Sequence, residues 1–78
     1  MTRAYILIQT EVGRAGSSVA EEIAKISGVV EADNVTGPYD VVVLAEADNL
    51  DGLNREVLSR IQGVIGITRT LTCPVVHL

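Results

Sequence analysis

Residue types that commonly carry catalysis, metal binding or disulfide bonds are scarce in this chain. It contains one cysteine (Cys73), one histidine (His77) and neither phenylalanine nor tryptophan. A lone cysteine excludes an intrachain disulfide and any multi-thiolate metal site within one chain, and we expect Cys73 to be a small buried hydrophobe. His77 is the penultimate residue, where terminal mobility makes a poor general base. The composition therefore indicates no enzyme, and it predicts no metal site and no cofactor.

Positive charge and long apolar runs are also scarce. Six Lys and Arg residues stand against ten Asp and Glu, which gives a net charge of −4 and a pI near 4.7. The basic residues are scattered, so we expect no direct binding to nucleic acid. No apolar run approaches the roughly 20 residues of a membrane helix, and the first residues do not have the layout of a signal peptide. We therefore expect a cytoplasmic protein without a membrane partner.

Aliphatic residues, in contrast, are abundant. Hydrophobic residues make up 47% of a chain of 78 residues, which we treat as a single domain, 1–78. A monomer of this size hides only about 60% of the surface of its extended chain. The apolar area exceeds what two layers of this size can enclose, so self-association is expected.

The chain contains an internal repeat. An offset of 35 residues aligns Gly28-Val29-Val30 with Gly63-Val64-Ile65, and it also aligns Ile6 with Val41. Each copy has the pattern of a strand, an amphipathic helix and a second strand. The predicted strands are 5–9, 29–35, 39–47 and 64–73, and the predicted helices are 18–26 and 50–61.

Two β-α-β units of this length predict an α+β, ferredoxin-like βαββαβ fold, an antiparallel sheet with both helices on one face. Strand 39–47 is apolar on both faces, so one set of its side chains, Val42 and Leu44 or their counterparts on the opposite face, points to a side of the sheet that no helix covers. In strand 64–73, alternation predicts Ile67, Arg69 and Leu71 on one face. The simplest cover for the bare face is a second subunit, which predicts a dimeric α+β barrel.

A tight turn follows the second strand. Gly37 tolerates positive φ, and Pro38 fixes φ near −65°, so the backbone is shaped before anything binds. Tyr39 and Asp40 at its exit supply a phenol and a carboxylate. Spacing alone leaves two interpretations open, an ordinary hairpin and a binding loop, and it favours the hairpin.

Other polar groups are weaker candidates. Thr68 and Thr70 form a hydroxyl row in the last strand, which β-propensity alone explains. In the expected sheet order this row is separated from the turn within one subunit, so the two meet only across an interface between subunits. The loop at residues 13–16 contains two glycines but lacks the lysine of a P-loop. Ser18 and Glu21 have the spacing of a capping box.

The stretch Val35-Thr-Gly-Pro-Tyr-Asp-Val-Val-Val, with Gly63-Val64 and Thr68-Arg-Thr70, resembles the effector-binding (RAM) domain of the Lrp/AsnC family of regulators. The resemblance implies dimers formed through their sheets, octamer or decamer rings, and amino acids bound between neighbouring dimers. It also implies that Gly37, Tyr39 and Asp40 hold the amino acid, and we extend this ligand-binding set to Pro38, Thr68 and Thr70.

Full-length members of that family carry an N-terminal helix-turn-helix domain, which this sequence does not contain. We therefore expect an amino-acid-binding regulatory and oligomerisation domain without direct DNA binding, with full-length regulators of the family as further partners. Two alternatives stay open. One is a cofactor-free dimeric α+β barrel enzyme of monooxygenase or isomerase type, whose pocket is commonly lined with aromatic residues. The other is an assembly module without a ligand.

Overall fold

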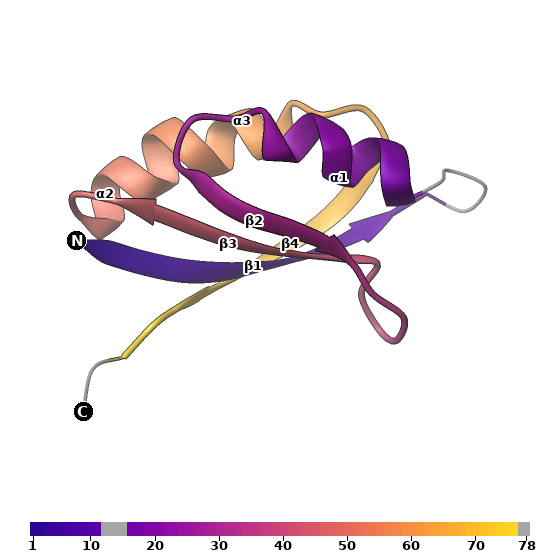
Figure 1. The fold of residues 1–78 in the computed structure, drawn as a ribbon, viewed down its shortest axis with the longest axis horizontal. Helices are drawn as coiled ribbons and strands as arrows, with labels where there is room; N and C mark the ends of the chain where they lie inside the picture. The colour runs from indigo at the N-terminus through magenta and orange to yellow at the C-terminus, as the bar shows by residue number, and fades with distance from the viewer. Residues whose placement is uncertain (12–15, 77–78) are drawn as a thin grey trace.

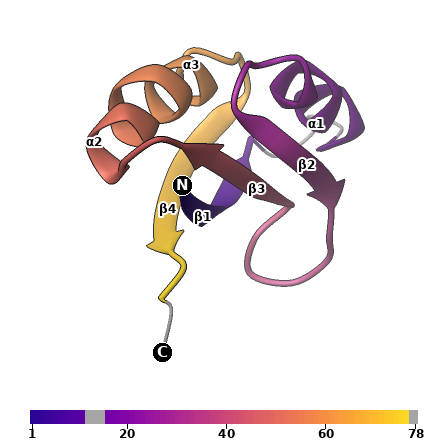
Figure 2. The same cartoon turned by 60° about the vertical axis from the view of Figure 1, so that its left-hand side comes forward.

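The computed structural model describes residues 1–11 and 16–76. Four antiparallel strands form one sheet in the order β2-β3-β1-β4. Both helical segments cover the same face of that sheet (Figures 1 and 2), which is the predicted ferredoxin-like arrangement. The elements are β1 (Thr2–Thr10), α1 (Gly16–Ala24), β2 (Val29–Asn34), β3 (Val41–Ala47), α2 (Leu50–Gly52), the π-helix η1 (Leu53–Leu58), α3 (Ser59–Gln62) and β4 (Ile67–Pro74).

The core lies between the sheet and the helices. Alternate side chains of the two central strands point toward the helices and are fully buried, because successive residues of a strand face opposite sides. Aliphatic side chains of the two helical segments pack onto them. The buried core residues are Ala4, Ile6, Ile8, Val19, Ala20, Ile23, Val41, Val43, Ala45, Leu53, Val57 and Ile61.

The opposite face of the sheet is apolar, and no helix of the described residues covers it. Leu7 pairs with Val42 on one side and with Leu71 on the other, so three aliphatic side chains form a row across the sheet. Tyr5 and Leu71 are each 46% exposed. The prediction of a bare apolar face is therefore confirmed. We call this surface the open face; its residues are Tyr5, Leu7, Val42, Leu44, Leu71 and Cys73.

Cys73 is exposed, so the expectation that it is buried is wrong. It lies on the edge strand β4, and its partner in β1 is Tyr5. Because Tyr5 points to the open face, Cys73 does so as well.

The internal repeat is real, but its offset changes along the chain. The first strands of the two copies keep the offset of 35, whereas the helix ends Ala24 and Gln62 are 38 residues apart. Gly28 therefore corresponds to Gly66, with φ of 96° and 103°, and not to Gly63. The reason is that the second helical segment, from Leu50 to Gln62, is longer than α1 and includes η1.

Two predicted strands begin too early. The third starts at Val41 and not at residue 39. Asp40 precedes it, and its N–H donates to the Ile8 carbonyl while its carbonyl accepts from Val35. The fourth begins at Ile67, since residues 63–66 form a turn. It ends at Pro74, one residue beyond the predicted end at residue 73.

A register shift in β1 changes the predicted faces of β4. Gln9 pairs with Arg69, but the next residue, Thr10, pairs with Ile67. The irregularity turns Ile67 toward the core, where it packs against buried residues, while Arg69 stays on the side of the open face. The prediction that Ile67 shares a face with Arg69 is therefore wrong.

Three features singled out from the sequence lie outside the described residues. They are residues 13–15 of the glycine-containing loop, the side chain of Ser18 with its predicted capping box, and His77.

Candidate functional site

The turn between β2 and β3 is hydrogen-bonded to the end of β1. The Gln9 side-chain amide donates to the Pro38 carbonyl at 2.8 Å. Asp40 Oδ2 accepts two hydrogen bonds from Thr10, at 2.8 Å from the backbone N–H and at 3.1 Å from the hydroxyl. Bonds to a carboxylate are stronger than those between neutral groups, so they fix the exit of the turn. Asp40 thus has a structural role in this subunit, beside the ligand-binding role expected of it.

The tip of the turn is open. Gly37 has a φ of 135°, and a Cβ added there would meet nothing within 4 Å. Pro38 is exposed, and Tyr39 is half-buried. Within the part of the chain that the structure describes, the Tyr39 hydroxyl makes no hydrogen bond. The backbone at Gly37 is therefore accessible, and the Tyr39 phenol has no hydrogen-bond partner among the described residues.

Thr68 and Thr70 line a small polar hollow of about 210 Å³ beside β4. The Thr70 hydroxyl accepts from the Gln62 side chain at 3.3 Å, and the Thr68 hydroxyl donates to the Gln9 carbonyl at 3.3 Å. Arg69 also lines this hollow. The two threonines singled out from the sequence therefore line one hollow, together with residues that the sequence did not single out.

The turn and the hollow lie at the same end of the sheet, one strand apart. Ile8 of β1 pairs with Val41, directly after the turn, and with Thr70 on its other side. The expected separation within one subunit is therefore observed. Gln9 is the residue that contacts both groups, the turn through its side chain and the hollow through its carbonyl.

Sequence reasoning missed Gln9, Gln62 and Arg69. Gln9 had one signal, an amide at the end of an otherwise apolar strand. Gln62 directly follows the predicted helix 50–61 and was not singled out, and Arg69 was interpreted only as one position in an alternating strand. Their shared hollow depends on how α3 lies over β4, which no local pattern reports.

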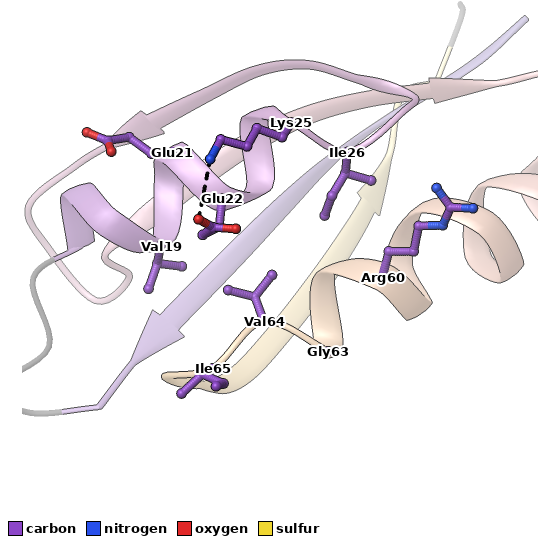
Figure 3. A pocket seen from close by; sticks show the side chains of 9 residues that line it. All are labelled: Val19, Glu21, Glu22, Lys25, Ile26, Arg60, Gly63, Val64 and Ile65. Carbon is purple, nitrogen blue, oxygen red and sulfur yellow. Dashed lines mark hydrogen bonds and ion pairs between the residues drawn. The ribbon is translucent and has the colours of Figure 1, made fainter.

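A larger groove of about 700 Å³ lies on the helical side of the molecule, between α1 and the segment that follows α3 (Figure 3). Aliphatic side chains line it, and charged side chains of both signs surround it. Glu22 and Lys25 form an ion pair at 3.5 Å on its α1 side, and Arg60 stands on its α3 side. No pattern in the sequence indicated this groove.

Residues 1–11 and 16–76 contain no group of His, Cys, Asp and Glu side chains placed to hold a metal ion. None of the helices in that part of the chain is long and apolar enough to span a membrane.

Comparison with known proteins supplies the family. Residues 3–77 match the family described as the Lrp/AsnC ligand binding domain. The HTH-type transcriptional regulator LysM of Saccharolobus solfataricus is 32% identical in an alignment of 71 positions that covers 88% of this chain and 50% of LysM. The chain thus spans about half the length of this relative.

Solved structures agree with the fold. The protein TTHA0845 of Thermus thermophilus is 32% identical and superimposes with a TM-score of 0.88, over 100% of this chain and 96% of that one. The transcriptional regulator NMB0573 of Neisseria meningitidis, solved as a complex with L-Met, is 17% identical with a TM-score of 0.82, over 97% of this chain and 50% of that one. At that identity the second likeness shows the fold alone. The family match over almost the whole length, together with the βαββαβ fold, establishes that this chain belongs to the Lrp/AsnC ligand-binding domain family.

Proposed function

We propose that this chain is a cytoplasmic regulatory and oligomerisation domain that binds a small effector, an amino acid, and does not itself contact DNA. The observation that carries the proposal is the family match to a ligand-binding domain over residues 3–77. Relatives of this chain are named as transcriptional regulators, which favours regulation over catalysis. The net charge of −4 opposes close approach to phosphates.

We place the effector at the end of β1, between the turn and the hollow beside β4. The hollow, at about 210 Å³, is smaller than the roughly 300–1,000 Å³ of drug-sized pockets, so it suits a small polar molecule. Thr70 carries a hydroxyl and Arg69, which also lines the hollow, carries a guanidinium, a group that pairs well with a carboxylate. Since β1 separates the turn from the hollow, a turn of a neighbouring subunit completes the site. An effector bound there stabilises the assembly.

The assembly begins with a dimer formed through the open face. Burial of apolar side chains contributes about 25 cal/mol per Å², so pairing two open faces is the favourable way to remove them from water. Further association of dimers gives the octamer or decamer rings that the family resemblance implies, and full-length regulators of the family are the partners in mixed assemblies.

A thermal-shift screen of the proteinogenic amino acids tests effector binding. A ligand that binds only the folded state raises Tm by mass action, so we expect one amino acid or a related group to raise it in a concentration-dependent manner. Thr70→Val should reduce the shift by removing the hydroxyl in the hollow, and Gly37→Leu should reduce it by obstructing the turn. Thr72→Val is the matched control, since Thr72 lies two residues further along β4 and does not line the hollow.

If no amino acid raises Tm, the effector class is wrong. If Thr70→Val and Gly37→Leu respond as the control does, the placement of the site is wrong.

A further inference from the structure

The tip of the turn between β2 and β3, residues 36–39, extends away from the sheet (Figure 1). Its base is closed by the Val35 N–H, which donates to the Asp40 carbonyl at 2.9 Å. Residues 36–38 are exposed, and a Cβ at Gly37 would meet nothing within 4 Å. Packing therefore does little to hold the tip in one shape, and any single contact that does so decides what the turn presents.

Gln9 supplies that contact. Its side-chain amide donates to the Pro38 carbonyl at 2.8 Å. In the part of the chain that the structure describes, this is the one hydrogen bond that joins residues 36–39 to another element. The strand register explains the contact, because Ile8 pairs with Val41, the first residue of β3. Gln9 thus lies one residue beyond the paired part of β3, beside the turn.

The same residue contacts the hollow through its backbone. The Gln9 carbonyl accepts a hydrogen bond from the Thr68 hydroxyl at 3.3 Å, at the point where the pairing of β1 with β4 shifts its register. A backbone carbonyl is retained whatever side chain the residue carries. Substitutions at Gln9 therefore release the turn and leave the acceptor of Thr68 in place, so the two contacts can be separated by experiment.

We propose that Gln9 is a positioning residue of the effector site. By holding the Pro38 carbonyl, its amide orients the Gly37 backbone and the Tyr39 phenol before an effector arrives. A turn that is already ordered loses less conformational entropy on binding, which increases affinity. This inference rests on the proposed function, and it assigns a residue to the site that contributes through the turn and need not touch the effector.

The order of the turn tests the proposal without any effector. Gln9→Met keeps the length of the side chain but has no donor, and Gln9→Glu offers an ionised carboxylate in place of the amide. We expect the ¹⁵N order parameters of Gly37 and Tyr39 to fall in both variants from about 0.85 toward 0.6 or lower. Gln9→Lys, which again has a donor of similar reach, should restore them. If Gln9 only filled space, Gln9→Met would behave as the wild type does.

Effector binding supplies the second measurement. The twenty proteinogenic amino acids are titrated in a thermal-shift assay, and the one that raises the wild-type Tm is compared between variants. We expect about three- to tenfold weaker binding to Gln9→Met, the effect of one lost hydrogen bond, and near wild-type binding to Gln9→Lys. Sedimentation velocity establishes that the variants assemble as the wild type does.

Gln62→Met is the matched control for the order of the turn. It makes the same change at a residue that contacts Thr70 of the hollow and not the turn, so the turn should remain as ordered as in the wild type.

A turn that stays ordered in Gln9→Met would overturn the proposal. So would a disordered turn with undiminished binding, because the shape of the turn would then not matter to the effector. If no amino acid raises the wild-type Tm, the proposed function fails, and the order parameters alone decide whether Gln9 holds the turn.

Discussion

Gly28 and Gly37 both have positive φ, but their surroundings differ. A Cβ at Gly28 would lie 2.6 Å from Val57 Cγ2 and 3.1 Å from the Glu46 carbonyl oxygen, whereas a Cβ at Gly37 would meet nothing within 4 Å. Gly28 is needed for conformation and for space, and Gly37 for conformation alone.

We therefore expect Gly28→Ala to destabilise the fold more than Gly37→Ala. Left-handed backbone costs a non-glycine residue about 1–2 kcal/mol, and overpacking at Gly28 adds about 1–3 kcal/mol. Urea denaturation of the two variants measures the difference. Equal losses would show that Val57 moves aside freely and that the close approach has no energetic consequence.

Asp40 illustrates how a motif residue can serve the fold as well as a ligand. Asp40→Ala leaves the partly buried Thr10 N–H without its acceptor, which we expect to lower the free energy of unfolding by about 1–3 kcal/mol. Chemical denaturation without any effector measures this loss. Asp33→Ala, at an exposed position of β2, is the control and should change stability by less than about 0.5 kcal/mol. An unchanged Asp40→Ala variant would argue against the structural role.

At the scale of elements, the two helical segments pack onto the sheet through buried side chains at equivalent positions. Ile23 of α1 and Ile61 of α3 are both fully buried, and each precedes the end of its helix by one residue. Both copies of the repeat thus bury an isoleucine at the same place in the helix, although η1 makes the second segment longer.

Ile23→Ala and Ile61→Ala should each cost about 2–5 kcal/mol, a large share of the roughly 5–15 kcal/mol that stabilises a typical domain. Leu50→Ala, at a position 42% exposed, should cost far less. Thermal and urea unfolding compare the three variants. A large loss for only one of the two isoleucines would mean that the halves of the repeat do not share the core equally.

At the scale of the whole molecule, the open face is the surface through which we expect the chain to dimerise. Leu44→Arg places a charge among apolar side chains of that face, and we expect it to weaken the sheet-face dimer at least about 30-fold, equivalent to about 2 kcal/mol. Sedimentation equilibrium measures the change, and Leu50→Arg, on the other layer, serves as the control. A sheet-face dimer that persists unchanged in Leu44→Arg would remove the basis for the dimer.

The spacing of apolar residues predicted most of the fold. An element that is buried on one face has apolar residues at the spacing of its own helix or strand. The spacing of Val41, Val43 and Ala45 located the strongest strand, and the bare opposite face was correctly expected. Boundaries were less accurate, as at Tyr39, which was expected to begin the third strand but precedes it by two residues. Thr68 and Thr70 line one hollow because they are neighbours in one strand, and their role in ligand binding stays a prediction.

The sequence by itself determined the fold class, the internal repeat and the membership of a family, since these depend on residue types recurring at fixed spacing. Only the tertiary structure decided that Gln9 links the turn to β4, that Asp40 is held by Thr10, and that Glu22 and Arg60 flank one groove. These groups are distant in the chain, and their meeting depends on strand register, on a bulge at Gln9 and on the length of a π-helical segment. Such features arise from packing between elements, which local patterns do not encode.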